Sequence, residues 1–270
     1  MTKVYALLGG GGLLPASWAE LLTRQKNTFL PIGFAGVSDK TFVTQYSPRI
    51  FRLGAIQKII HYLKNQGVTH VMMVGYFTRP TLFSLLPDWK GFLWLLTLMK
   101  QRGDDSYLRC LIRLLEAEGF QVCSPEDISD DDLTLLPACY THVMPSASQR
   151  ASIARGIEVL AALSPVDVGQ AVVVNNQHVL GIEAVEGTQG LLSRCALYLE
   201  AKGAVLVKCA KAGQDLRLDR PTIGPDTIDQ LVAAGFAGVA VQARCCYVID
   251  AQKTLEKANE SGVFVCAVDV

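Results

Sequence analysis

The feature that most constrains this fold is a buried strand that runs directly into a glycine turn and then into a helix. The predicted strand covers residues 3–8 (KVYALL), the turn is GGGGLLP at 9–15, and a helix is expected from Ala16 or Ser17 to about Arg24. Ser17 is the expected helix cap. A strand, a glycine turn and a helix in this order are typical of a βαβ unit. The chain is therefore expected to build a parallel sheet covered by helices.

The same alternation recurs along the chain and predicts an α/β protein. The expected helices are 54–65, 104–118, 148–163, a helix opened by the turn at 186–188, 225–234 and 251–260, and the expected strands are 69–76, 120–123, a pair turning near Asn176-Gln177, 205–211, 237–243, 247–250 and 263–270. Residues 124–148 have no sustained period and are rich in turn formers and acids. We expect two α/β domains: a Rossmann-like parallel sheet at 1–135, a linker at 136–147, and a catalytic domain with a mixed sheet and helices at 148–270.

Charge and cysteine usage exclude several classes of protein. Lysine plus arginine balance aspartate plus glutamate at 25 each, so no basic field favours nucleic acid as a partner. The 8 cysteines lie in mostly apolar surroundings without a C-x-x-C spacing, which predicts small buried side chains in a reducing compartment rather than a zinc site or disulfides. No cleavage site follows the first apolar run, so a signal peptide is not expected, and we predict a cytoplasmic protein.

The apolar run FLWLLTLM at 92–99 is far shorter than the roughly 20 residues that a membrane-spanning helix needs. Two interpretations remain open for it. It is either a buried core helix or a segment that covers a lipid or contacts a membrane surface.

The glycine turn alone identifies no cofactor. The dinucleotide fingerprint G-x-G-x-x-G fails in both registers, because Leu14 and Pro15 stand where its last glycine is required. No Gly-Lys-Ser/Thr follows, which excludes a P-loop, and a G-x-S-x-G nucleophile elbow is also missing from the sequence. A generic phosphate contact and a merely tight turn both remain open, and an NAD-linked oxidoreductase is disfavoured.

Charged side chains gather around predicted turns, above all in KAGQDLRLDRPTIG at 211–224. In an extended segment Asp215, Arg217 and Asp219 share one face, where they would serve a metal ion and a phosphate or form a surface ion-pair ladder. The other candidates are Arg79, the pairs Asp104–Asp105 and Glu183–Glu186, and the lysines Lys208 and Lys211. For Asp104 and Asp105 the sequence slightly favours a structural role as partners of a helix dipole. Carboxylates suit magnesium and cations suit phosphate, so the set favours magnesium-assisted hydrolysis at phosphorus.

Six motifs in a fixed order carry a resemblance to a known family. They are G-G-G-x-L-P from Gly10, R-P after GYF, G-D-D before a helix, D-x-G-Q before a strand, E-A-x-E-G-T from Glu183, and K-x-x-Q-D-x-R-x-D-x-P-T-I-G from Lys211. Together they resemble the LpxI family, the UDP-2,3-diacylglucosamine pyrophosphatases of lipid A synthesis. Ala212 and Gln189 depart from the family pattern, where proline and an acid are usual.

The resemblance implies hydrolysis of UDP-2,3-diacylglucosamine to 2,3-diacylglucosamine 1-phosphate (lipid X) and UMP. It also implies magnesium as cofactor, a homodimer, and peripheral contact with the cytoplasmic face of the inner membrane. By motif position the family's essential aspartate falls on Asp219, as metal ligand or as general base. The expected catalytic residues are Asp219, Arg217 and Asp215, the expected metal ligands are Asp219 and Glu183, and the expected substrate-binding residues are Gly10, Gly11, Gly12, Leu14, Arg79, Asp104, Asp105, Gln170, Glu186, Gly187, Thr188, Lys208, Lys211, Gln214 and Thr222. The alternative is a non-catalytic nucleotide-sugar or lipid-binding protein.

Overall fold

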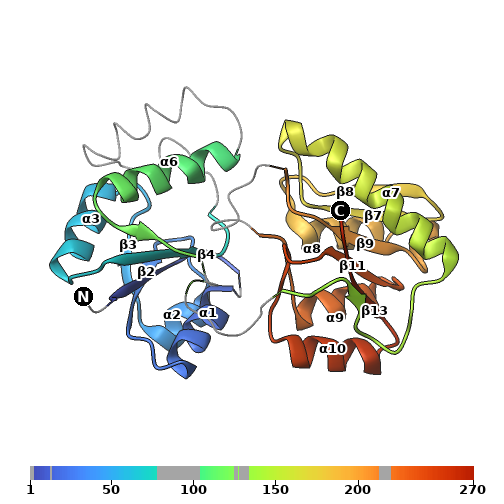
Figure 1. Ribbon diagram of the computed structural model, residues 1–270, viewed down its shortest axis with the longest axis horizontal. Helices are drawn as coiled ribbons and strands as arrows, with labels where there is room; N and C mark the ends of the chain where they lie inside the picture. Colours follow the sequence, from blue (N-terminus) through green and yellow to red (C-terminus); the bar gives the residue numbers. More distant parts are fainter. Residues whose placement is uncertain (1–2, 13, 78–103, 125–126, 128–133, 213–219) are drawn as a thin grey trace. The chain divides into compact units, whose positions relative to one another are not determined.

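A computed structural model of the chain describes residues 3–12, 14–77, 104–124, 127, 134–212 and 220–270, without the side chains of 104–109 (Figure 1). The chain divides into two compact units, Met1–Asp131 and Asp132–Val270. Each unit is a sheet covered by helices, which confirms the α/β prediction. Within these described ranges, no helix has both the length and the apolar character needed to cross a bilayer.

The first unit is a parallel sheet with the strand order β3-β2-β1-β4-β5. Its strands are β1 Tyr5–Gly9, β2 Phe29–Phe34, β3 Arg49–Phe51, β4 His70–Val74 and β5 Gln121–Val122. Helices α1 Leu14–Arg24 and α2 Lys40–Tyr46 cover one face, and α3 Ile56–Asn65 and α6 Asp104–Ala117 cover the other (Figure 1). The chain reverses its direction of travel across the sheet between β1 and β4. The loops after these two strands therefore meet at a topological switch point.

Two features of the first unit differ from the predictions. Helix α1 begins at Leu14 and includes Ser17, which is therefore not its cap. Pro15 suits the first turn of a helix because its fixed φ is already helical and its missing N–H would have no partner there. No element was predicted between 25 and 53, where β2, α2 and β3 lie. Strand β2 reads FLPIGF, whose proline and glycine weaken a strand signal.

The second unit is a mixed sheet, which confirms the prediction, and its strand order is β6-β13-β11-β9-β7-β8. The strands are β6 Ala138–Cys139, β7 Ala171–Asn175, β8 His178–Ile182, β9 Val205–Lys208, β11 Gly238–Gln242 and β13 Phe264–Val268, with a separate parallel pair formed by β10 Thr222–Ile223 and β12 Tyr247–Val248. Helix α7 Ala147–Leu163 packs on one face, and α8 Gly187–Cys195, α9 Pro225–Ala233 and α10 Ala251–Glu260 pack on the other. Strand β6 lies in the range 136–147 that was predicted as a linker.

The β7–β8 hairpin determines which residues meet at the edge of this sheet. Strand β7 runs antiparallel to both β8 and β9, so β8 runs parallel to β9 and β11. Asn176 and Gln177 form its predicted turn, with φ of 46° and 64°, the left-handed values that a two-residue hairpin turn requires. The ends of β8, β9 and β11 and the start of β7 consequently lie at one edge, where ligands bind in open α/β sheets.

The prediction that disulfides are absent is wrong for one pair, since Cys139 of β6 and Cys266 of β13 are bonded in this structure. The two residues are direct partners in the antiparallel pairing of β6 with β13, with Cα atoms 4.0 Å apart. They are separated by 127 residues in sequence, and such spacing carries no information about pairing.

Three other cysteines agree with the prediction of small buried side chains. Cys123, Cys209 and Cys246 are each less than 5% exposed, and burial raises the pKa of each thiol to about 12. The thiolate is the nucleophile, so these groups should stay protonated and unreactive at pH 8. We expect iodoacetamide at pH 8 to modify the partly exposed Cys245 within minutes and to leave these three unmodified, as read by peptide mass spectrometry. Labelling of all four at similar rates in folded protein would contradict this assignment.

Candidate functional site

A carboxylate at the edge of the second sheet joins two of the sequence motifs. Glu183, directly after β8, accepts a hydrogen bond from the backbone N–H of Gln170 at 2.8 Å and one from the Thr188 hydroxyl at 2.7 Å, one on each carboxylate oxygen. Gly169 lies against the same residue, with φ of +58° and room for no side chain, because a Cβ there would be 2.2 Å from the carbonyl oxygen of Glu183. The D-x-G-Q and E-A-x-E-G-T motifs therefore form one structure.

A buried lysine extends this network to a third motif. Lys208 ends β9 and is only 6% exposed. Its ammonium donates to the Thr188 hydroxyl at 3.0 Å and to the backbone carbonyl of Thr222 at 2.9 Å. A directed chain of hydrogen bonds thus runs from Lys208 through Thr188 to Glu183. Lysine is almost never this buried unless its charge is compensated, and here the compensation comes from oxygens at the edge where a ligand would bind.

The segment 213–219, which contains Asp219, has both of its flanks fixed near this network. On the amino-terminal side, the ammonium of Lys211 contacts the Asp167 carboxylate at 2.5 Å and the Ala212 N–H donates to the Ser164 hydroxyl. On the other side, the Arg220 guanidinium lies 4.9 Å from the centre of the Tyr247 ring, and β10 begins at Thr222. The start and the end of the K-x-x-Q-D-x-R-x-D-x-P-T-I-G motif are therefore both held at this edge.

Glu186 is engaged by a neighbour on the same helix. Its carboxylate forms a 2.7 Å ion pair with Arg194 of α8, and the hydrogen bond from Arg194 holds the pKa of Glu186 below its usual value. Gly187 is the first residue of α8 and has a φ of +70°, a conformation that favours glycine. These two predicted site residues thus define the start of α8, which carries Thr188.

The glycine turn of the first unit is packed closely against the residues that follow β4. The Gly10 N–H donates to the Val74 carbonyl at 2.8 Å, and Gly11 and Tyr76 exchange two backbone hydrogen bonds of 2.9 and 3.1 Å. A Cβ on Gly10 would lie 2.5 Å from the Tyr76 carbonyl oxygen. The amides of Gly10 and Gly11 are therefore used within the protein, and close approach of the backbone is the reason for these glycines. Leu14 begins α1 immediately after the turn.

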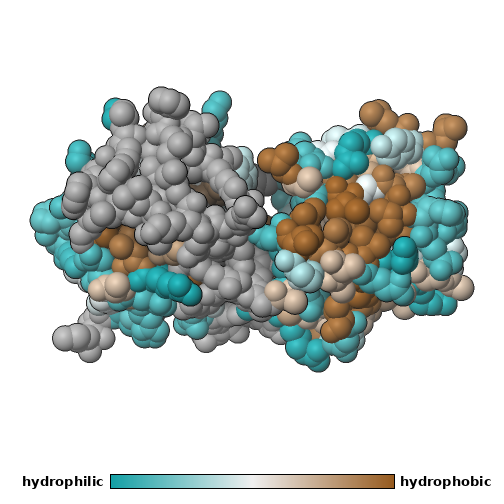
Figure 2. Space-filling view, turned by 90° about the horizontal axis from the view of Figure 1, so that it is seen from above, coloured by the Kyte–Doolittle hydropathy of each residue, from teal (hydrophilic) through white to brown (hydrophobic). Residues whose placement is uncertain are grey.

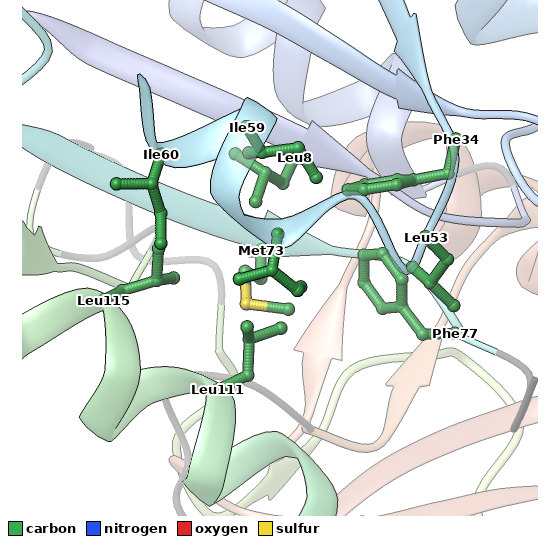
Figure 3. A pocket seen from close by; sticks show the side chains of 10 residues that line it. Leu8, Phe34, Leu53, Ile59, Ile60, Met73, Phe77, Leu111 and Leu115 are labelled. Atoms are coloured by element: carbon green, nitrogen blue, oxygen red, sulfur yellow. The ribbon is translucent and has the colours of Figure 1, made fainter. Parts of the chain in front are cut away.

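An apolar cavity of about 20 Å³ lies in the first unit between the sheet, α3 and α6 (Figure 3). Its lining includes Leu8, Phe34, Met73, Phe77 and Leu111. A cavity of this kind needs roughly 10–15 Å³ to hold one water molecule, so this space is too small for an acyl chain.

Several predicted site residues lie outside the described part of the chain. These are Arg79, Gln214, Asp215, Arg217 and Asp219, together with the 92–99 run and the side chains of Asp104 and Asp105. The backbone confirms that α6 begins at Asp104. In the described ranges the structure brings together Gln170, Glu183, Thr188, Lys208 and Thr222.

Sequence reasoning left Asp167 and Gly169 out of the predicted site. Both belong to the D-x-G-Q motif that the resemblance uses, and that motif was the only available signal for them. The residue types alone gave none, because an aspartate and a glycine between a helix and a strand are common in turns.

Comparison with known proteins agrees with this arrangement of motifs. The family model described as "LpxI N-terminal domain" matches residues 4–131, and the model described as "LpxI C-terminal domain" matches residues 137–266. The chain belongs to the LpxI family. The UDP-2,3-diacylglucosamine pyrophosphatase LpxI of Caulobacter vibrioides is 31% identical to it over 272 aligned positions, covering 97% of this chain and 96% of that protein. The two LpxI domain matches fall within the two compact units of the structure.

Proposed function

We propose that this LpxI protein hydrolyses UDP-2,3-diacylglucosamine to lipid X and UMP in a magnesium-dependent reaction of lipid A synthesis. The observation that supports the proposal most directly is the buried Lys208, held at the strand edge by Thr188 and the Thr222 carbonyl. The reaction cleaves a diphosphate, and a preorganised ammonium is suited to the negative charge that such a group carries. The matched family and the named function of the Caulobacter relative supply the identity of the substrate.

Magnesium is compatible with the donor set at this edge. Each carboxylate oxygen of Glu183 accepts one hydrogen bond and retains acceptor capacity, since a carboxylate offers about four lone-pair sites. Magnesium in proteins is often held by one or two carboxylates together with substrate phosphates and water. We propose that Glu183 and Asp219 supply the carboxylates. No group of three or more metal-ligating side chains occurs among the residues that the structure describes. When bound, the ion would neutralise diphosphate charge and lower the pKa of a coordinated water.

The protein's own groups have separate roles in this proposal. Lys208 binds a diphosphate oxygen. The Thr188 hydroxyl accepts a hydrogen bond from the Lys208 ammonium and donates one to Glu183, and it thereby fixes the direction of the ammonium. Asp219 orients the attacking water or accepts its proton. Arg217 and Asp215 complete the charge balance around the diphosphate, and Lys211 anchors the segment that carries them through Asp167.

The decisive experiment measures release of UMP and lipid X from UDP-2,3-diacylglucosamine with magnesium and with a chelator. We expect the native protein to form both products only with the metal, and Asp219→Ala to lower turnover by about 10²–10⁴-fold, the usual contribution of a general base. Asp226→Ala is the matched control, because Asp226 is an exposed acid in the first turn of α9. Its turnover should equal that of the native chain.

The alternative function makes a different prediction in the same assay. A non-catalytic nucleotide-sugar or lipid-binding protein would bind the substrate tightly and release no product with any divalent metal. Folded protein that behaves in this way would refute the proposed hydrolase.

We also propose a homodimer and a peripheral contact with the inner membrane, which the family resemblance implies. Figure 2 shows apolar side chains gathered on one face of the second unit. Large apolar residues that are more than four-fifths exposed in that unit are Val185, Leu197 and Leu199. Exposed apolar surface is where a second protomer or a lipid surface would be accommodated.

A further inference from the structure

An exposed aromatic ring lies at the switch point of the first sheet. Tyr76 follows β4 by two residues and is 64% exposed. It faces the glycine turn that follows β1, and β1 and β4 are the adjacent strands between which the chain reverses direction. Ligands of open α/β sheets bind at this position, beyond the carboxyl ends of the strands. The predicted site residues do not include Tyr76.

The position of the ring is fixed from several sides. Tyr76 exchanges two backbone hydrogen bonds with Gly11, and its ring lies over that glycine so closely that a Cβ there would be 2.4 Å from Cζ. The preceding Gly75 has φ of +92°, and a Cβ on it would meet the Gly11 carbonyl oxygen at 2.5 Å. The next residue, Phe77, lines the apolar cavity and packs edge-on against Phe34 with ring centroids 5.5 Å apart (Figure 3).

The exposure of this ring is unexplained by packing. Tyr76 makes no ring-to-ring contact with another aromatic side chain in the described part of the chain. One side of the ring rests on the backbone of Gly11 and Gly12, and the residue is still almost two-thirds exposed. An aromatic ring that is held in place with one face exposed is suited to stacking on a planar group. Because the fold already fixes the ring, binding costs little additional side-chain conformational entropy.

We propose that Tyr76 is a stacking platform for the uracil ring of the nucleotide. This inference rests on the proposed function, because uracil is the planar group of a UDP-linked substrate. Stacking on an aromatic side chain needs only the π-face of a base, so it requires no additional hydrogen-bonding residue. Tyr76 would therefore strengthen nucleotide binding without taking part in the chemistry.

The test compares two probes that differ by the base. UMP carries uracil, and ribose 5-phosphate is the same molecule without it. Calorimetric titration of the full chain should show Tyr76→Ala weakening UMP binding about tenfold, or about 1.4 kcal/mol. Tyr76→Phe, which keeps the ring, should bind UMP within about twofold of the native chain. Ribose 5-phosphate should bind all three proteins equally, and Tyr198→Ala is the control for loss of an exposed tyrosine elsewhere.

Steady-state kinetics provides an independent measurement. Stacking acts equally on substrate and transition state, so Tyr76→Ala should raise KM about tenfold and leave kcat nearly unchanged. The inference would be overturned if Tyr76→Ala bound UMP with native affinity, or if it lost UMP and ribose 5-phosphate binding equally. In either case, product formation by the native chain would leave the proposed function intact. A native chain that neither forms product nor binds UMP would refute both.

Discussion

Lys208→Met is expected to lower kcat/KM for UDP-2,3-diacylglucosamine at least about 100-fold, with the protein still folded. Methionine keeps the apolar length of the side chain and removes only the ammonium. Loss of one preorganised charge-stabilising donor in an enzyme site costs about 10²–10³-fold in rate. The Thr188 hydroxyl can keep its hydrogen bond to Glu183 in this variant, so we expect the local structure to be retained. The rate of UMP formation gives kcat/KM for each variant. Thermal unfolding followed by circular dichroism shows whether the variant is folded.

Lys202→Met is the matched control, because Lys202 is an exposed lysine of the same unit. It should retain native kcat/KM. Activity of Lys208→Met within about threefold of the native value would show that Lys208 only ties β9 to the segment at Thr222. The Thr188 link is examined by comparing Thr188→Ser, which keeps the hydroxyl, with Thr188→Val, which has nearly the same shape without it. Only the valine variant should approach the defect of Lys208→Met.

Gly169→Ala is expected to destabilise the second unit by about 2–4 kcal/mol. Two costs add at this position. The φ of +58° is strained for alanine, and the new Cβ would be 2.2 Å from the Glu183 carbonyl oxygen, which is backbone and has little freedom to move. Relief of that clash would displace Glu183 from the Gln170 N–H, so activity should fall together with stability. Chemical denaturation of the native and variant chains gives the difference in unfolding free energy.

Gly262→Ala separates the two costs. Gly262 has a similar φ of +69°, yet nothing lies within 4 Å of the Cβ that the substitution would add. It should lose only the conformational part, about 1 kcal/mol, and keep full activity. Equal decreases in the free energy of unfolding for the two variants would mean that the contact between the new Cβ and Glu183 does not affect stability.

Much of the architecture follows from the sequence because its elements are long and strongly periodic. Helix α3 and the strands β7 and β8 have clear apolar patterns. Residues with positive φ mark their boundaries: Gly67 follows α3, and Asn176-Gln177 joins the two strands. The short elements between 25 and 53 have no such pattern. Helix α2 has only seven residues and begins because the Asp39 carboxylate accepts a hydrogen bond from the Thr41 N–H, a contact that sequence reasoning passed over.

The candidate site was predicted at the level of residue types and not at the level of contacts. Glu183 and Lys208 were both selected for their charge, and the structure shows that Thr188 joins them. Their connection depends on the reversal of β7, which brings residue 170 beside residue 183 and next to the end of β9. Contacts between residues so far apart depend on strand order, and the alternation of helices and strands does not determine strand order.

The central position of the first strand has a consequence for synthesis on the ribosome. Strand β1 pairs with β2 on one side and with β4 on the other. After residue 34 has been made, residues 35–74 still have to follow, which takes about 2–8 seconds at about 5–20 residues per second. During that time one edge of a strand destined for full burial offers unpaired backbone groups to other chains. Chaperones that hold short apolar segments have an early target here, and slower translation of residues 35–74 would lengthen the exposure.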